Sequence, residues 1–220
     1  GWSSHSSIRG FSYGQDVVGG SNDAGNYFWQ AGGEGHAIPY SEVYIRADTP
    51  PTLAYSVAAG TSGGQSYTGN LGMDFNVGGT PVQVFAVGYF APSSATPPAG
   101  YTITVGIFDR STGTLVNGTK KFFSSNDPGT AIAGTAMRIA YLSYPVTLSA
   151  NSQYVIVAQG YGASFLNGNG AAASFSSTNA GNNARISFVG QSRYTHGSFA
   201  FPTTIDANVA QYGAGTFLFR

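Results

Sequence analysis

The stretch Thr102-Ile103-Thr104-Val105-Gly106-Ile107 decides the fold class of this chain. Along an extended strand, successive side chains point to opposite faces. We therefore expect Ile103, Val105 and Ile107 to face a core, and the two threonines to face away from it. The alternation has a period of two, which is typical of a β-strand with one buried face.

Similar segments recur on both sides of this stretch. Met137, Ile139 and Tyr141 alternate in the same way beside Arg138. Residues 82–90 and 154–161 are apolar at nearly every position, which predicts central strands that are covered on both faces.

Between the predicted strands lie short segments rich in turn-forming residues. Residues 109–114 and 126–129 contain the Asp, Asn and Gly typical of tight turns. No window of eleven or more residues carries a helical period without Gly or Pro. The sequence thus predicts an all-β protein, a jelly-roll-like antiparallel β-sandwich forming a single domain with an N-terminal extension.

Composition narrows the possible partners. Only 8% of the 220 residues are charged, nine basic residues balance nine acidic ones, and there is no cysteine. Such a neutral chain offers no electrostatic surface for nucleic acid. It also lacks a run of about 18 apolar residues, so we expect no membrane insertion. A net charge near zero weakens repulsion between copies, which favours self-association.

Five segments of the chain carry a resemblance to a known family. They are Val82-Gln83-Val84-Phe85-Ala86-Val87-Gly88-Tyr89-Phe90, Val105-Gly106-Ile107-Phe108-Asp109 with Gly113-Thr114-Leu115-Val116, Tyr141-Leu142-Ser143-Tyr144-Pro145-Val146-Thr147-Leu148, Asn151-Ser152-Gln153-Tyr154-Val155-Ile156-Val157, and Tyr212-Gly213-Ala214-Gly215-Thr216-Phe217-Leu218-Phe219. In this order they resemble secreted bacterial β-sandwich modules, often found in proteins with a C-terminal PEP-CTERM sorting signal and related to the domain DUF4082. The resemblance covers about residues 71–220.

This resemblance implies a jelly-roll fold, an extracellular or cell-surface location and no established catalytic residues. The chain departs from the pattern at Arg220, where it stops without the Pro-Glu-Pro signal and apolar tail. Residues 1–70 lie outside the match. We expect them to form an N-terminal arm and additional strands packed on the sandwich, with residues 71–220 as the core module.

Two segments suggest catalysis but lack its context. Gly60-Thr61-Ser62-Gly63-Gly64 matches the Gly-x-Ser-x-Gly motif, yet neither the strand before it nor the helix after it is predicted. Glu34 and His36 share a strand face near Glu42, but metal sites need three or four ligands at recognised spacings. A surface pair beside a buried Ile38 and Tyr40 is the favoured explanation, and no enzyme is predicted.

Aromatic and amide side chains in the loops suggest a glycan site. An aromatic ring stacks on a sugar while a few polar groups orient it. The alternative for each ring is packing in the core or on a sheet. The candidate residues for glycan binding are Trp29, Tyr161, Tyr194, Asn167, Asn169 and Gln191.

One cofactor, a structural calcium ion, is considered. Asn22, Asp23 and Asp127 offer oxygen ligands of the kind that Ca²⁺ takes, but the full calcium-loop signature is missing. Turn formation by Asn and Asp explains these residues as well. Asn117-Gly118-Thr119 is an acceptor sequence for N-glycosylation in a host that glycosylates.

These observations favour a non-enzymatic, extracellular structural or adhesive protein that assembles with copies of itself or with other extracellular macromolecules. A carbohydrate-binding, lectin-like module is the alternative, and a glycan-active enzyme is the third. The arm carries Ile8, Phe11, Tyr13, Val17 and Val18, and the chain has only two lysines to protect its sheet edges. The arm is predicted to add to a neighbour's sheet, or alternatively to complete its own.

Overall fold

The computed structural model describes residues 17–21, 27–31, 50–169, 175–177, 185–207 and 211–220. The chain divides into two compact units, residues 1–50 and residues 51–220. In the first unit, β1 (Val17–Ser21) pairs antiparallel with β2 (Tyr27–Ala31). Among the described residues, no helix is long and apolar enough to cross a membrane.

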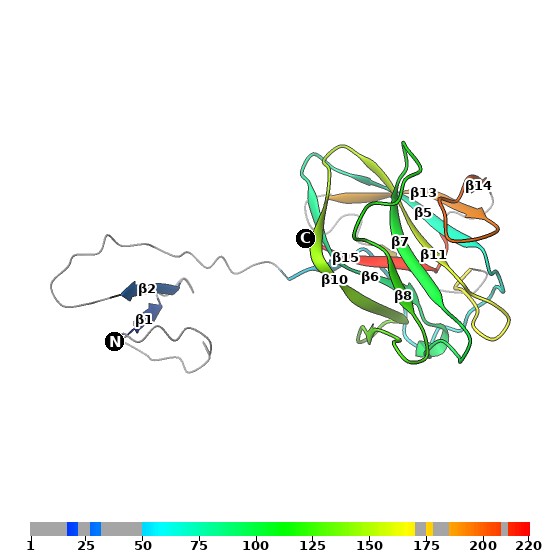
Figure 1. Cartoon of the computed structure of the whole chain (residues 1–220), viewed down its shortest axis with the longest axis horizontal. Helices are drawn as coiled ribbons and strands as arrows, with labels where there is room; N and C mark the ends of the chain where they lie inside the picture. The colour runs from blue at the N-terminus through cyan, green and yellow to red at the C-terminus, as the bar shows by residue number, and fades with distance from the viewer. Residues whose placement is uncertain (1–16, 22–26, 32–49, 170–174, 178–184, 208–210) are drawn as a thin grey trace. The chain divides into compact units, whose positions relative to one another are not determined.

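Residues 51–220 form two antiparallel sheets packed face to face, as Figure 1 shows. The five-stranded sheet has the order β3-β15-β6-β10-β9, with β3 at Thr52–Leu53, β15 at Gly215–Phe219, β6 at Val82–Phe90, β10 at Met137–Leu148 and β9 at Thr130–Ala131. The six-stranded sheet has the order β14-β13-β5-β11-β7-β8, with β14 at Thr204–Asp206, β13 at Ile186–Thr195, β5 at Asn70–Val77, β11 at Gln153–Gln159, β7 at Ile103–Asp109 and β8 at Lys121–Phe123. A small pair joins β12 (Phe175–Ser177) to β4 (Tyr55–Val57), and η1 (Pro92–Ser94) is a single 3-10 turn. The predicted all-β sandwich is confirmed.

Strand β7 buries the face that its alternating sequence predicts. Ile103, Val105 and Ile107 of β7 lie in the main core between the sheets and are fully buried. The two segments predicted to be central are central, since β6 pairs with β10 and β15 and β11 pairs with β5 and β7. The period-two pattern of β7 therefore predicted its buried face, and the continuous apolar runs of β6 and β11 predicted their central positions.

The turn predicted after β7 is also confirmed. The Asp109 carboxylate accepts hydrogen bonds from the backbone N–H groups of Ser111 (2.8 Å) and Thr112 (3.1 Å). Gly113 adopts a φ of +68°, which a residue with a Cβ rarely adopts. These hydrogen bonds hold the pKa of Asp109 below its ordinary value, with the Ser111 side chain as the largest cause.

One expectation needs correction. Tyr141 does not face the core, because it is 62% exposed. Ile139 and Tyr141 pair in regular register with Gly88 and Ala86, and Ile139 lies with Ala86 in a small cluster apart from the main core, so this face of β10 points away from the other sheet. The chain divides after residue 50, and β3 and β4 belong to the sandwich unit. The packing of residues 1–50 on the sandwich stays a prediction.

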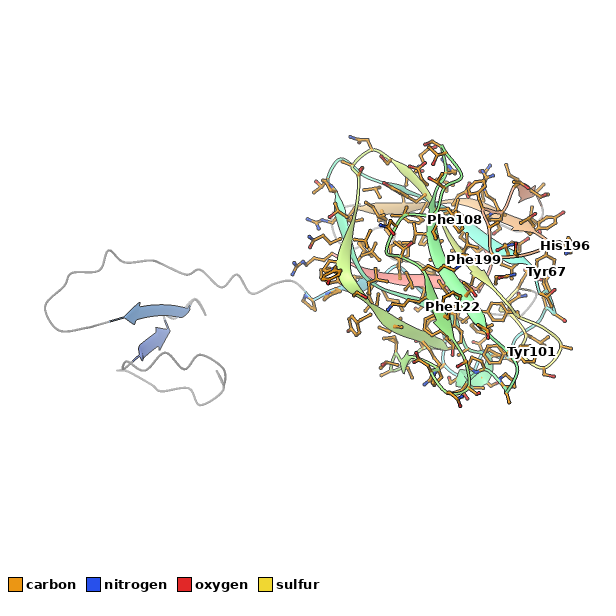
Figure 2. All side chains as sticks on the ribbon, viewed as in Figure 1. Tyr67, Tyr101, Phe108, Phe122, His196 and Phe199 are labelled. Carbon is orange, nitrogen blue, oxygen red and sulfur yellow. The ribbon has the colours of Figure 1, made fainter. Side chains whose placement is uncertain are left out.

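A second apolar layer covers the outer face of the six-stranded sheet. There, Phe108, Val155 and Val157 form a small cluster beneath Phe199 and Phe201 of the β13–β14 loop, residues 196–203. Figure 2 labels Phe108 and Phe199, whose ring centroids lie 5.4 Å apart. The sheet leaves room for the loop at Gly72, where a Cβ atom would lie 2.8 Å from the Pro202 ring. The β13–β14 loop is thus folded back over its own sheet.

The same face carries a buried ionic cluster. Asp74 of β5 is fully buried, and its carboxylate accepts hydrogen bonds from Arg193 Nε (2.7 and 3.0 Å) and Arg110 Nη1 (3.1 Å). Arg110 also bonds Gln153 on β11 (3.3 Å). The Asp74 cluster therefore ties together strands β13, β5 and β11 and the end of β7.

Candidate functional site

A pocket of about 110 Å³ opens beside β13 and β14. It is formed by segments that lie far apart in the sequence, namely the β4–β5 loop, the strands β5, β13 and β14, and the turn before β15. The lining residues are Gln65, Tyr67, Leu71, Tyr194, Asp206 and Tyr212.

Two tyrosine rings stand as perpendicular walls of this pocket. The ring centroids of Tyr67 and Tyr194 lie 6.2 Å apart, with an angle of 87° between the ring planes. The ring of His196 also contacts the Tyr67 ring, with a centroid distance of 5.0 Å. Figure 2 shows these two side chains next to each other. Tyr194 on β13 pairs in register with Leu71 on β5, so the two side chains are neighbours on the same face of the sheet.

A carboxylate lies against a third tyrosine. Tyr212 is almost fully buried and donates a hydrogen bond of 2.6 Å to Asp206 Oδ2. Burial raises the pKa of Tyr212, and the hydrogen bond to Asp206 and its negative charge raise it further. The Tyr212 hydroxyl therefore stays protonated and holds Asp206 in one orientation at the pocket.

Two buried hydroxyls lack a partner among the described residues, and one of them lies in the pocket lining. They are Tyr67 Oη, in the pocket lining, and Ser192 Oγ. Ser192 pairs in register with Asp206, and directly opposite residues of a strand pair share one face of the sheet. No other side-chain nitrogen or oxygen in the described part of the chain is buried and unpartnered. Because buried polar groups are nearly always hydrogen-bonded, the Tyr67 hydroxyl is a group that a ligand in the pocket would satisfy.

Two buried asparagines form hydrogen bonds that fix the segments lining the pocket. Asn167 donates hydrogen bonds to the backbone oxygen (3.0 Å) and the side-chain oxygen (3.2 Å) of Gln65. Asn70 donates to the Ser198 oxygen (2.9 Å) and accepts from the Ala200 N–H (3.0 Å), which fixes the loop between Tyr194 and Asp206. The lining residues are therefore pre-positioned, which reduces the entropy lost when a ligand binds.

The structure brings part of the predicted glycan set to this pocket. Tyr194 lines it, and Asn167 supports Gln65 from behind. The backbone N–H of Asn169 donates a hydrogen bond of 2.9 Å to the side-chain oxygen of Asn167. Gln191 is exposed on β13, two residues before Arg193, and is not part of the lining.

The interpretation of Tyr161 as a glycan contact is wrong. Its ring is fully buried in the core, stacked at 5.9 Å on Phe165, and offers no face to a ligand. Its hydroxyl lies 2.9 Å from the Phe90 oxygen and 3.0 Å from the Ala214 oxygen. Tyr161 is thus the core residue that the alternative interpretation described.

This placement predicts the effect of removing one oxygen. Tyr161→Phe removes the hydroxyl that bonds the buried Phe90 and Ala214 carbonyls, of which Ala214 keeps the hydrogen bond from the Phe90 N–H, so we expect the free energy of unfolding to fall by about 1–3 kcal/mol. Urea denaturation followed by circular dichroism measures this change. The control is Tyr144→Phe, since Tyr144 is 80% exposed and its loss of a hydroxyl is expected to leave stability unchanged. Equal midpoints for the two variants would contradict the assignment.

For the other predicted site residues, the structure gives little or no information. Trp29 lies in β2, whose side chains are outside the description, and Asn22, Asp23, Glu34, His36 and Glu42 fall outside the described residues. Asp127 is exposed in the turn that Ser124 closes, where the Ser124 N–H bonds the Asp127 oxygen at 3.0 Å. Within the described ranges, no group of three His, Cys, Asp or Glu side chains could hold a metal ion. The calcium assignment stays a prediction.

Sequence reasoning missed Gln65, Tyr67, Asp206 and Tyr212. Gln65 and Tyr67 lie in a Gly/Ser-rich loop that the composition marks as a ligand-facing candidate, so a weak signal existed for them. Asp206 is one of only nine acidic residues in the chain, and that rarity is its only signal. Tyr212 is the first residue of the strand motif 212–219, and nothing else in the sequence marks it as a binding residue.

The chain matches no protein-family model and shows no significant similarity to a curated protein. The resemblance to secreted PEP-CTERM-associated or DUF4082-like modules therefore stays a prediction.

Proposed function

We propose that this chain is a non-catalytic, extracellular adhesive module that binds saccharides through the pocket lined by Tyr67, Tyr194, Asp206 and Tyr212. The observation that carries the proposal is a buried hydroxyl in the pocket lining, Tyr67 Oη, which has no hydrogen-bond partner among the described residues. A sugar hydroxyl both donates and accepts hydrogen bonds, so it satisfies groups of this kind.

The composition of the lining supports a sugar over other small ligands. Tyr67 and Tyr194 offer aromatic surface to the C–H groups of a sugar ring, while Gln65 and Asp206 offer polar atoms to its hydroxyls. Leu71 adds one apolar contact. This mixture of a few fixed polar groups and aromatic walls is common to small-ligand sites.

The lining also favours binding over hydrolysis. Glycoside hydrolases commonly place two carboxyl groups on either side of the scissile bond. Among the six lining residues, Asp206 is the one carboxylate, and the hydrogen bond from Tyr212 already occupies one of its oxygens. A fixed acceptor of this kind serves recognition.

Substitution of one wall tests the proposal. Tyr194→Ala removes a ring of the aromatic pair, and we expect the affinity for the best-bound monosaccharide to fall roughly tenfold. Isothermal calorimetry with glucose, galactose, mannose, glucosamine and N-acetylglucosamine measures the affinities of the full chain.

The matched control is Phe122→Ala. Phe122 is an exposed aromatic residue on β8, outside the pocket, and Figure 2 shows it apart from Tyr67. Its removal is expected to leave sugar affinity unchanged. If no saccharide binds the wild-type chain, or if both variants lose affinity equally, the pocket is not a saccharide site.

A second candidate function, self-assembly into a structural layer, is favoured by β10, which is largely unpaired along one side among the described residues. β9 covers only Arg138 and Ile139 of this strand, and no charged residue occurs from Ile139 to Leu148. Tyr141 and Tyr144 are exposed on it. Charged side chains commonly protect an edge strand against pairing with another copy, and this segment of β10 has none, although Pro145 lies in it.

A lysine on this edge tests self-assembly. Tyr144→Lys restores protection, so we expect the weight-average mass of the wild-type chain to rise with concentration and that of the variant to stay at the monomer value. Sedimentation velocity over a concentration series measures both. Phe122→Lys, on the other sheet, is the control and is expected to assemble like the wild type. A wild-type chain that stays monomeric at every concentration would remove this candidate.

A further inference from the structure

The dipeptide Asn-Gly occurs at residues 117–118, 167–168 and 169–170. In this dipeptide the backbone nitrogen of the glycine faces the side-chain amide carbon of the asparagine and can attack it. A glycine places no Cβ beside that nitrogen, so the approach is less hindered than it is before other residues. Asparagine is for this reason a thermally labile residue, and the fold decides which copy of the dipeptide reacts.

The pair at residues 117–118 lies in a turn that leaves both reacting groups free. The Thr119 N–H bonds the Val116 oxygen at 3.2 Å, and Gly118 has a φ of +82°, which is the geometry of a type II turn with Asn117 and Gly118 at its centre. Both central residues are exposed. Within the described part of the chain, neither the Asn117 side chain nor the Gly118 N–H forms a hydrogen bond.

The two ends of this turn are fixed, whereas its middle is not. The Val116 N–H donates to the Ile107 oxygen at 2.8 Å. The buried Thr119 hydroxyl donates to the Val116 oxygen (2.7 Å) and accepts from the Ile107 N–H (3.1 Å). A reaction at Asn117 therefore requires rotation of the peptide unit between Asn117 and Gly118, and it leaves the sheets closed.

The pair at residues 167–168 is the same dipeptide in the opposite environment. Asn167 is fully buried, and its side-chain nitrogen donates to the backbone oxygen (3.0 Å) and the side-chain oxygen (3.2 Å) of Gln65. The Gly168 N–H donates to the Gly213 oxygen at 2.7 Å. Both the amide that would leave and the nitrogen that would attack are held, so the reaction there has to wait for local unfolding. Gly170, of the third pair, lies outside the described residues.

We infer that Asn117 is a site of spontaneous deamidation in the folded chain. The Gly118 nitrogen gives up its proton and forms a bond with Asn117 Cγ, the bond from Cγ to the amide nitrogen breaks, and ammonia leaves with the proton. Water then opens the resulting succinimide ring at either carbonyl, which gives aspartate or isoaspartate. Water is the one co-reactant, and neither the saccharide pocket nor self-assembly takes part.

The product changes the charge of a chain that has few charges. Nine basic and nine acidic residues give a net charge of 0, so one new carboxylate makes the chain acidic. The isoaspartate form also adds a carbon to the main chain between Val116 and Thr119. Ion-exchange chromatography separates the acidic form from the parent chain.

The experiment incubates the full chain at mildly alkaline pH, once folded and once in concentrated urea, and locates new carboxylates by peptide mapping. Trypsin releases residues 111–120, which contain Asn117 and no Asp or Glu, and tandem mass spectrometry reads Asn167 within residues 139–185. In the folded chain we expect Asn117 to deamidate at least about tenfold faster than Asn167. In urea we expect similar rates, because both asparagines precede a glycine and the fold no longer protects either.

Asn117→Gln tests the assignment, because a glutamine side chain would have to close a larger ring. We expect the acidic form that arises at position 117 to disappear and the melting temperature to stay unchanged, since the Asn117 side chain is exposed. Asn126→Gln is the matched control. Asn126 is also exposed but precedes Asp127, so the variant is expected to accumulate the acidic form like the wild type.

Two results would overturn the inference. One is equal rates for Asn117 and Asn167 in the folded chain. The other is an acidic form that accumulates in Asn117→Gln as fast as in the wild type. Both results leave the saccharide function untouched, because neither asparagine is a lining residue of the pocket.

Discussion

Asp74→Ala is expected to lower the free energy of unfolding by about 3–5 kcal/mol, which is the usual cost of removing one partner from a buried ion pair. Asp74 is fully buried in β5, and it is the shared acceptor of Arg193 and Arg110. Without it, two largely buried guanidinium groups lose their counter-charge at once. Small domains have a net stability of about 5–15 kcal/mol, so the loss is a large share of the total.

Thermal and urea denaturation measure this loss, with Asp127→Ala as the matched control. Asp127 is exposed and its side chain forms no ion pair among the described residues, so its removal is expected to change stability by less than about 0.5 kcal/mol. Equal melting temperatures for the two variants would show that the Asp74 cluster does not hold the sheet together.

A triple variant, Asp74→Leu with Arg110→Met and Arg193→Met, tests the reason for the effect. Replacing a whole buried ionic cluster with apolar residues is often neutral or stabilising, because no charge remains to be desolvated. The neighbouring face is apolar, since Phe201 lies 5.6 Å from the Arg193 guanidinium. We therefore expect the triple variant to recover most of the stability lost by Asp74→Ala. A triple variant that is no more stable than the single one would show that the hydrogen-bond geometry of the cluster matters more than its charge.

The elements that sequence reasoning predicted are those determined by nearest neighbours along the chain. The buried face of β7 follows from its own alternation, and the turn at Asp109 follows from its own hydrogen-bonding residues. Tyr141 breaks this rule because the face that it shares with Ile139 is covered only by a small cluster of Ala86, Ile139 and Leu218. A period-two pattern identifies two faces, but which of them the other sheet covers depends on the fold.

The pocket could not be predicted for a related reason. Its residues come from the β4–β5 loop, three strands of one sheet and the turn before β15, so they become neighbours only through the fold. Tyr194 was named from its aromatic character alone. Tyr161 was named on the same grounds and lies in the core, since aromatic composition does not distinguish a wall of a pocket from a packed ring.

Alkaline unfolding is the second large effect that we expect, and it follows from tyrosines buried in the sandwich. Burial raises the pKa of Tyr55, Tyr89, Tyr161 and Tyr212 above the ordinary value of about 10. Neighbouring tyrosines add to the rise at Tyr161, and Asp206 adds to it at Tyr212. Because these folded-state values exceed the unfolded value, the tyrosines contribute stability that is fully present below about pH 10 and is lost as the pH rises above it.

The loss is expected to be cooperative, since ionising a buried hydroxyl is costly and unfolding relieves all four at once, with the positive charge of Arg138 reducing the effect at Tyr89. Circular dichroism and the ultraviolet absorbance of tyrosinate, followed together from pH 8 upward, measure it. We expect the absorbance of the buried tyrosines to rise in one step that coincides with the loss of β-structure. Tyr89→Phe removes one raised group and is expected to make stability fall less steeply with pH above about 10, even if the lost hydrogen bond to Pro128 lowers stability at neutral pH. With only two lysines in the chain, amine deprotonation contributes little in this range. Complete tyrosine ionisation in a chain that keeps its β-structure would show that these hydroxyls are not buried as described.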